Sequence, residues 1–424
     1  MNDQKTAIVL GGTVPHGELI KELKNRGYTA ILVDYFADPP AARYADIHYR
    51  ESAMDLQAVL KIARQHEADL VISSCLDQQM NIAMKVAEEL GLKHPFSAEV
   101  CENVTNKGRM KKIMMDHGIP TAQYHVIDQE TDLDHLQLSD TVIIKPEDSC
   151  GSAGVSKVSF ADKTRIKEAI HKACSFGTSG NAIIEDYIEG TEMGVHGYVQ
   201  DGSFHLIFGT CKISVIDGDM TRQLCNLYLL EIRTSLKEKL LKIANDIVKA
   251  FRLPADTPLF MQVIVRDDEV FVIEFSPRVA GGTSSEVARD YAGFDSLVYS
   301  IDSYLGAFHE VETPKLSRYV CCFPLYAKAG ILGKIGGPKA LSADKTVDRV
   351  ILLKHPGDPI GNDKPSSANV LKYILSGSSY EECYEKTRRA DEMTEILDQD
   401  GNSLRTEKGQ LTHELLVKKL SELL

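Results

Sequence analysis

The sequence predicts an α/β fold that becomes α+β after roughly the first hundred residues, and three observations carry this prediction. Short apolar runs alternate with amphipathic segments at the start, as in a parallel sheet covered by helices. Later segments alternate apolar and polar residues in period two, which is typical of antiparallel strands. The character changes again after residue 315, where Gly330, Gly333, Gly336 and Gly337 lie close together.

The first hundred residues predict a small doubly wound α/β unit. Its apolar runs are bounded by turn residues, as buried parallel strands should be. Between them, apolar residues such as Ile82, Val86 and Leu90 share one helical face. The expected strands are Thr6–Leu10, Thr29–Val33 and Leu70–Ile72, and the expected helices are Gly17–Arg26, Leu56–His66 and Gln78–Leu90.

The turn after the first expected strand runs from Gly11 to Gly17 and is rich in glycine. It does not match GxGxxG, which argues against NAD, although Asp34 stands about 20 residues on, where a ribose-binding acid stands in dinucleotide folds. Two interpretations stay open. The glycines let a helix N-terminus approach a small carboxylate or phosphate, or the segment is a plain tight turn.

Beyond residue 105 the expected elements are strands with single helices between them. The turn Arg266-Asp267-Asp268 predicts a hairpin. Gly401 falls too early for a calcium loop, so Asp398–Asn402 predicts a polar turn. The expected strands are Thr141–Ile144, Val155–Ser159, Ala182–Ile184, His196–Gln200, Phe204–Thr210, Leu259–Val265, Glu269–Phe275 and Val347–Leu353, and the expected helices are Lys107–His117, Ala161–Ser175, Leu236–Phe251, Tyr380–Leu397 and Leu411–Leu424.

Composition excludes several classes of protein. The 424 residues are 43% hydrophobic and 26% charged, which suits folded domains rather than disorder. A net charge of −13 argues against nucleic-acid or anionic-membrane partners. No apolar run is long enough for a membrane span, and the start lacks a signal-peptide pattern. Nine cysteines without a CxxC pair favour reduced thiols and a cytoplasmic location.

The segment from Ile143 to Val155 predicts a phosphate site. Lys145 ends a strand, and a small glycine-containing loop, Glu147–Gly154, turns straight back into the next strand. Such a loop can donate backbone N–H groups to a triphosphate while the lysine supplies a point charge. The P-loop pattern GxxxxGK[ST] is absent.

Four motifs in order give this loop a context. Asn106-Lys107-Gly108-Arg109 precedes it; Glu185-Asp186-Tyr187-Ile188 and Gln262 follow, and then Glu274-Phe275-Ser276-Pro277-Arg278. The ordered set, covering essentially the whole chain, resembles the ATP-grasp superfamily and, within it, the carboxylate–amine ligases. The C-terminal segments are similar to the closing domain of bacterial L-amino-acid ligases, the dipeptide synthetases.

The resemblance implies a role for each matching residue. It implies ATP and Mg²⁺ (or Mn²⁺) as cofactors, an adenine-reading segment with a ribose-binding acid, and an arginine that steadies the phosphoryl and acyl-phosphate charge. The nucleotide residues are Lys107, Lys145, Ser149, Gly151, Ser152, Gly154, Glu185, Asp186, Tyr187, Ile188 and Glu192; the metal ligands are Gln262, Glu274 and Ser276; the catalytic residues are Lys145 and Arg278.

The chemistry of the residues agrees with these roles. Magnesium prefers oxygen ligands, and Glu274 and Ser276 stand two apart on a strand and so face the same side. The family more often has an acid where Gln262 stands and Asn where Ser276 stands. Candidate substrate residues are Arg278, Gly281, Gly282, Thr283, His196 and Arg222, with Lys212 and Asn226 in the same region.

The resemblance also implies an organisation and a reaction. The domains expected are a Rossmann-like pre-ATP-grasp domain (1–104), an ATP-grasp body (105–315) with a small lid (about 118–190) and a larger subdomain (about 191–315), and a closing domain (316–424). A carboxylate would be activated by ATP as an acyl phosphate and captured by an amine, with amino acids as substrates and a homodimer as the assembly.

Two alternatives remain open. The chain could be another ATP-grasp ligase, resembling biotin carboxylase or acting on a nucleotide precursor. It could also be an ATP-binding regulatory protein with little turnover, which Gln262 and Ser276 motivate.

Overall fold

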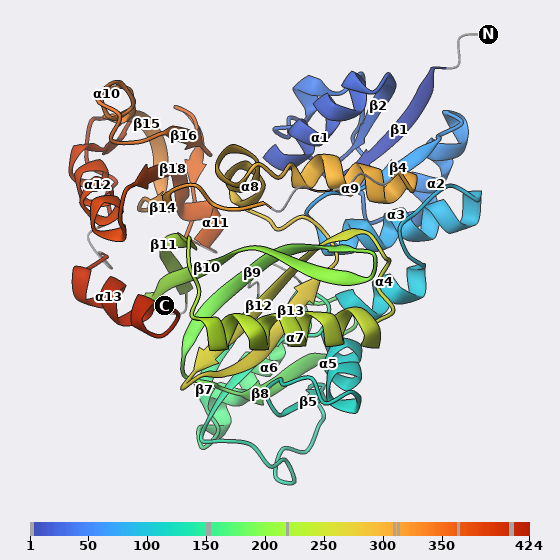
Figure 1. Cartoon of the computed structure of the whole chain (residues 1–424), viewed down its shortest axis with the longest axis horizontal. Helices are drawn as coiled ribbons and strands as arrows, with labels where there is room; N and C mark the ends of the chain where they lie inside the picture. Colours follow the sequence, from blue (N-terminus) through green and yellow to red (C-terminus); the bar gives the residue numbers. More distant parts are fainter. Residues whose placement is uncertain are drawn as a thin grey trace.

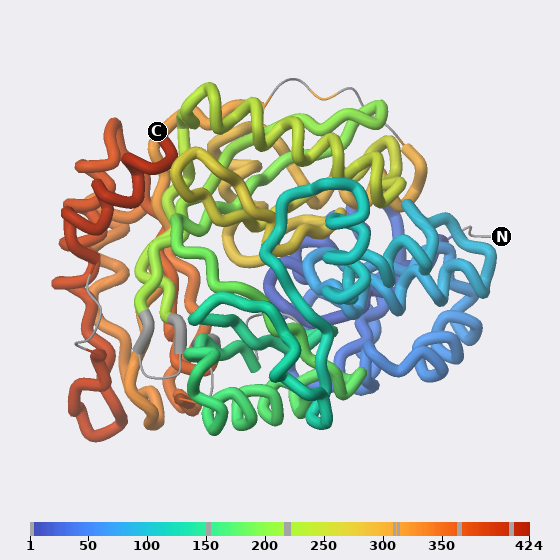
Figure 2. Tube along the Cα trace, turned by 90° about the horizontal axis from the view of Figure 1, so that it is seen from below, coloured from blue at the N-terminus to red at the C-terminus, as the bar shows by residue number. Residues whose placement is uncertain are grey.

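The computed structural model describes residues 4–149, 154–217, 220–307, 311, 314–362, 365–406 and 411–424 (Figure 1). The N-terminal unit (blue) and the C-terminal segments (red) lie on opposite sides of a central body, as Figures 1 and 2 both show. Among the described residues, no helix combines the length and apolar character that crossing a bilayer requires.

The N-terminal unit is the predicted parallel α/β unit. Its four-stranded sheet has the order β3-β2-β1-β4, with every neighbouring pair parallel. Helix α1 begins three residues before the expected start, because Pro15 suits the first turn of a helix. The elements are β1 (Lys5–Leu10), α1 (Val14–Asn25), β2 (Tyr28–Val33), the short 3₁₀ turn η1 (Ala42–Tyr44), β3 (Ile47–Tyr49), α2 (Leu56–Gln65), β4 (Leu70–Ile72), α3 (Asp77–Leu90) and α4 (Ala98–Thr105).

The predicted lid is a second, four-stranded sheet with the order β5-β8-β6-β7. Its apolar face packs on one amphipathic helix, which buries Ile166, Ile170 and Ala173. Helix α5 (Lys107–Asp116) precedes the lid, whose elements are β5 (Tyr124–Ile127), β6 (Thr141–Pro146), β7 (Ser156–Ser159), α6 (Lys163–Phe176) and β8 (Ala182–Asp186).

One antiparallel sheet of eight strands forms the centre, with the order β13-β12-β9-β10-β11-β14-β18-β16. It runs across residue 315, because β11 pairs with β14. The expected hairpin is present: Asp267 and Asp268 both have positive φ between β12 and β13. The elements up to residue 307 are β9 (Thr191–Gln200), β10 (Ser203–Asp217), β11 (Met220–Leu229), α7 (Thr234–Ala250), β12 (Thr257–Arg266), β13 (Glu269–Ser276), α8 (Ser284–Ala292) and α9 (Ser296–Leu305).

The C-terminal segments add strands to this sheet and form a small sheet of their own. The helix expected over Tyr380–Leu397 is wrong at its end. Thr394 is extended, and the residues after it pair with β15, burying Ile396. The elements are β14 (Tyr319–Tyr326), β15 (Gly330–Gly336), α10 (Pro338–Ala343), β16 (Arg349–Leu352), β17 (Pro359–Ile360), α11 (Pro365–Ala368), β18 (Asn369–Gly377), α12 (Tyr380–Met393), β19 (Glu395–Asp398) and α13 (His413–Ser421).

Candidate active site

The β12–β13 hairpin brings the proposed metal ligands together. Gln262 is directly opposite Glu274, so both side chains point to one face of the sheet. Ser276 lies two residues further along β13 and is buried. The three side chains offer an amide oxygen, a carboxylate and a hydroxyl, which are hard donors suited to Mg²⁺. They include one acid, and among the described residues no group of three or more His, Cys, Asp or Glu side chains could hold a metal.

A buried cluster of two lysines and one glutamate lies where β6 and β8 meet α5. Glu185 forms ion pairs with Lys145 and with Lys111, the latter at 2.7 Å between Nζ and Oε2. Lys111 also donates to the hydroxyl of Thr121 at 2.7 Å. All three charged side chains are less than one-tenth exposed. The cluster therefore has two positive charges and one negative charge among its three side chains.

Burial and charge act in opposite directions on this cluster. Burial would raise the pKa of Glu185, but the positive charges of Lys145 and Lys111 outweigh it and lower that pKa to about 2. Burial lowers the pKa of Lys111 to about 8, despite the opposing effect of Glu185 and with help from the charge of Lys145. Glu185 thus stays ionised at neutral pH, and both of its carboxylate oxygens pair with lysines.

The phosphate loop is held at its first residues. The backbone N–H of Lys107 donates to the carbonyl of Glu147 at 3.0 Å, and its amine contacts the carbonyl of Ser149. Gln78, in the first turn of α3, donates to the carbonyl of Asp148 at 2.8 Å. Gly154 has φ +73°, and a Cβ there would meet Pro146 and Phe176. Gly151 and Ser152 lie outside the described residues.

The segment after β8 connects the lid to the central sheet. The carboxylate of Asp186 accepts from the N–H of Ser139 at 2.6 Å, and the amine of Lys157 lies 3.4 Å from the ring centroid of Tyr187. Ile188 follows directly. Glu192, on β9, accepts from the amine of Lys212 at 2.7 Å. The adenine and ribose contacts of these residues are predictions.

Arg278 forms an ion pair that the sequence did not suggest. Its Nε and Nη2 atoms lie 2.7 and 2.5 Å from the two carboxylate oxygens of Asp77, the first residue of α3. Ser276 donates to the same carboxylate at 2.7 Å. The carboxyl edge of the N-terminal sheet thus meets the end of β13, and Asp77 connects the proposed metal ligand to the proposed catalytic arginine.

The other proposed substrate residues divide into two groups. Gly281 and Gly282 follow Arg278 on the surface, and the hydroxyls of Thr283 and Tyr228 share a hydrogen bond of 2.9 Å. His196 instead packs between the rings of Phe208 and Phe260. Burial lowers the pKa of His196 to about 3, so its ring is neutral.

Arg222 lies apart from the other proposed substrate residues. It lines a small pocket with residues of β14 and α12, and its guanidinium carbon is 5.9 Å from the ring centroid of Tyr326. Of the proposed site residues, Arg222 alone lines that pocket. Asn226, further along β11, is opposite Lys212 in the sheet.

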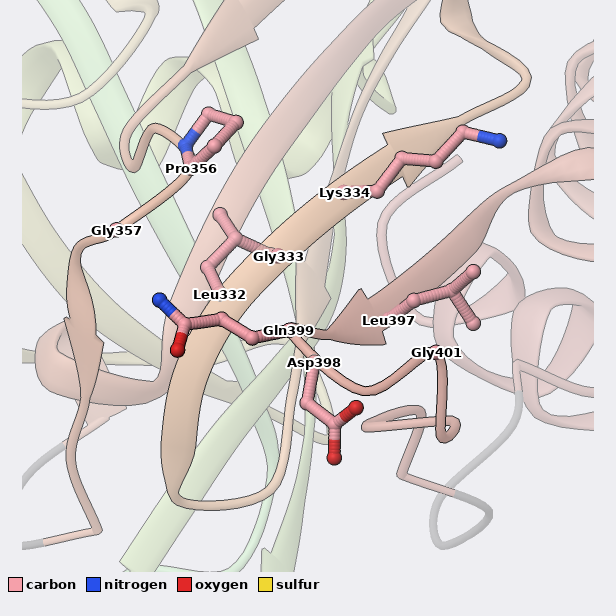
Figure 3. A pocket seen from close by; sticks show the side chains of 9 residues that line it. All are labelled: Leu332, Gly333, Lys334, Pro356, Gly357, Leu397, Asp398, Gln399 and Gly401. Atoms are coloured by element: carbon pink, nitrogen blue, oxygen red, sulfur yellow. The ribbon is translucent and has the colours of Figure 1, made fainter.

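A second pocket, away from the proposed site, is lined by residues of β15 and β19 and by Pro356 and Gly357 (Figure 3). Its polar side chains do not converge: those of Lys334, Asp398 and Gln399 point in different directions. The carboxylate of Asp398 accepts the N–H groups of Asp400 and Asn402, which confirms the predicted polar turn.

Two residues of the site were missed from the sequence, Asp77 and Lys111. A signal existed for each. Lys111 stands one helical turn after Lys107, and Asp77 follows β4, where the carboxyl ends of parallel strands meet. Neither signal identifies its partner, because Glu185 and Arg278 lie far away along the chain.

Comparison with known proteins finds a domain match for part of the chain. Residues 104–282 match the model of an ATP-grasp domain. The chain contains an ATP-grasp domain. A formate-dependent phosphoribosylglycinamide formyltransferase from Prochlorococcus marinus is 26% identical over 290 residues, which are 66% of this chain and 72% of the relative. This relationship makes the chain an ATP-grasp ligase, a class of enzyme that forms carbon–nitrogen bonds.

Solved structures extend the likeness in fold to nearly the whole chain. The L-amino acid ligase from Bacillus licheniformis has a TM-score of 0.79 at 20% identity, covering 94% of this chain and all of that one. The biotin carboxylase domain of 2-oxoglutarate carboxylase from Hydrogenobacter thermophilus, a dimer solved with MgADP and bicarbonate, has a TM-score of 0.71 at 16% identity and covers 92% of this chain and 90% of its own.

Proposed function

We propose that this enzyme joins a carboxylate to an amine at the expense of ATP, with amino acids as substrates and Mg²⁺ or Mn²⁺ as the metal. The observation that carries the proposal is the buried cluster of Lys111, Glu185 and Lys145, whose surplus positive charge suits an anionic nucleotide. The hairpin residues Gln262 and Glu274, opposite one another, suit the metal that accompanies ATP.

The proposed reaction has two steps. A carboxylate oxygen of the first substrate attacks the γ-phosphorus of ATP, ADP leaves, and an acyl phosphate forms. The amine of the second substrate then attacks the acyl carbon, loses a proton and expels phosphate, which leaves an amide. When bound, the metal neutralises charge on the phosphates.

Residues of the chain bind ATP, orient the transferred group and protect the acyl phosphate from water. Lys145 and Lys107 contact phosphates, and Arg278 steadies the charge on the transferred group. Water has to be excluded from the site, because it would otherwise hydrolyse the acyl phosphate. The backbone of Asp186, Tyr187 and Ile188 forms hydrogen bonds with the edge of the adenine ring. Because two lysines occupy the carboxylate of Glu185, its proposed part is to hold Lys145 rather than to contact adenine.

The amino-acid substrates are inferred from the likeness to an L-amino acid ligase. A second candidate is ligation of a nucleotide precursor, which the formate-dependent phosphoribosylglycinamide formyltransferases among the relatives favour. A homodimer is proposed as the assembly, and light scattering of the purified protein would test it.

A coupled ADP-release screen tests the function. Amino acids are supplied singly and in pairs with MgATP, and phosphoribosylglycinamide with formate is supplied in a parallel series. The proposal expects ADP and phosphate only when both a carboxylate and an amine are present. ADP release that requires phosphoribosylglycinamide would favour the second candidate function. MgATP binding without ADP release from any mixture would contradict both functions.

A further inference from the structure

We propose that Asp77 is a positioning residue that fixes the guanidinium of Arg278 and the hydroxyl of Ser276 for the ligation reaction. The inference rests on the proposed function, in which Arg278 meets the reacting oxyanion. It assigns a part of the site to the N-terminal unit.

The contacts define one orientation of the guanidinium. Asp77 accepts through both carboxylate oxygens from Nε and Nη2 of Arg278, while Nη1 donates to the carbonyl of Val279 at 2.9 Å. A guanidinium has five N–H donors in a fixed plane. These contacts use three of them, so one N–H on each terminal nitrogen is left for the two oxygens of an incoming anion.

Burial makes the pair strong and difficult to replace. The side chains of Arg278 and Asp77 are 13% and 18% exposed. Burial would raise the pKa of Asp77, but Arg278 and the donated hydrogen bonds lower it below its usual value. Burial opposes the charge of Arg278 as well, and Asp77 raises its pKa above the ordinary value. Both groups therefore stay ionised over the working range of pH.

The pair also connects regions that are distant in the sequence. Asp77 begins α3 in the N-terminal unit, whereas Arg278 follows β13 in the central sheet. The next residue, Gln78, holds the carbonyl of Asp148 at the start of the phosphate loop. One turn of α3 thus contacts the arginine, the proposed metal ligand and the loop, so misplacing this turn would disturb all three.

The first test compares Asp77→Asn with Asp302→Asn. Asp302 is the control because it pairs with Arg26 at 2.5 Å between the N-terminal unit and α9, at a similar level of burial but without contact to Arg278. Asp77→Asn is expected to lower kcat by about 10²-fold and to raise the KM of the carboxylate substrate more than the KM of ATP. Asp302→Asn should change none of these.

Chemical rescue separates positioning from folding. Free guanidinium should restore part of the turnover of Arg278→Ala, because Asp77 can hold it in place, but none of the turnover of Asp77→Asn/Arg278→Ala. Equal rescue in both backgrounds, or equal kcat in Asp77→Asn and the wild type, would overturn the proposal.

A measurement without substrate keeps the two proposals apart. In ¹⁵N-labelled full-length protein, the Arg278 Nε–H, assigned with Arg278→Lys, should be protected from exchange in the wild type and exchange rapidly in Asp77→Asn. An unchanged signal in Asp77→Asn refutes the role of Asp77. If the wild type releases no ADP with any substrate pair, the proposed function fails, while this spectrum still decides the role of Asp77.

Discussion

Two buried ion-pair clusters of this enzyme differ in their balance of charge. The Lys111–Glu185–Lys145 cluster has two cations for one anion, whereas the Asp77–Arg278 pair has one of each. The first keeps one positive charge beyond its own ion pair, which the carboxylate of Glu274 partly offsets at Lys111. The second is complete in charge but has N–H donors to spare.

The difference indicates two kinds of task. A surplus of buried positive charge is costly in an empty protein and becomes favourable when an anion arrives, which suits binding. A neutral, bidentate pair gives little net attraction at long range but fixes direction, which suits orientation of a reacting group. We therefore expect changes in the first cluster to alter nucleotide affinity and stability, and changes in the second to alter the rate.

Removing Lys145 should have the largest effect. Lys145→Ala removes a buried cation near the end of β6, just before the phosphate loop, and is expected to lower ADP release by about 10³-fold and to weaken MgATP binding in calorimetry. Lys163→Ala, an exposed lysine of the same lid, is the matched control. Wild-type turnover in Lys145→Ala would show that the cluster does not serve ATP binding or catalysis.

Glu185→Gln should destabilise the fold, because it leaves two lysines buried without a counter-charge. We expect a loss of about 3–5 kcal/mol at pH 7 in urea denaturation. The folded protein lowers the pKa of Glu185 to about 2. The stability that the ionised carboxylate contributes is therefore complete at pH values above the pKa of Glu185 in the unfolded chain, and it is lost as the pH falls toward 2. The stability gap between variant and wild type should therefore narrow below about pH 4.5. A gap that does not depend on pH would contradict this assignment.

Lys111→Met converts the first cluster into a one-to-one pair like the second. The surplus charge disappears, so MgATP should bind about tenfold more weakly, which is roughly 1.4 kcal/mol. Stability should change by no more than about 1 kcal/mol, because Glu185 keeps Lys145 and a lysine with a lowered pKa is removed. Unchanged nucleotide affinity in calorimetry would show that the surplus charge does not serve binding.

His196→Phe should have the smallest effect. The ring is neutral and packs between two phenylalanines, so the variant should keep the wild-type pH dependence of turnover between about pH 5 and 8. If the variant loses a step in the pH dependence of turnover within that range, His196 takes part in the reaction and its assignment as a packing residue is wrong.

Elements with a clear periodicity could be predicted from the sequence. Strand β4 and the β12–β13 hairpin stand where expected, because a buried apolar run and a two-aspartate turn are local signals. Strand β11 was not expected, since adjacent residues such as Leu224 and Cys225 are both buried in a strand that lies between β10 and β14, and its pattern does not alternate. The end of α12 was misjudged because Ile396 continues an apolar pattern that belongs to a strand.

The candidate site was predictable only where its motifs are local. Gln262, Glu274 and Ser276 could be placed on one face from the hairpin alone. The ion pairs of Arg278 with Asp77 and of Glu185 with Lys111 are tertiary, and no spacing in the sequence indicates them.

Transfer of oxygen tests the central claim most directly. With a carboxylate substrate labelled with oxygen-18 and an unlabelled amine, the enzyme should release phosphate that carries one labelled oxygen for each amide formed, because the bridging oxygen of the acyl phosphate comes from the carboxylate. Phosphate without label, formed while the amide accumulates, would contradict activation of the carboxylate by ATP.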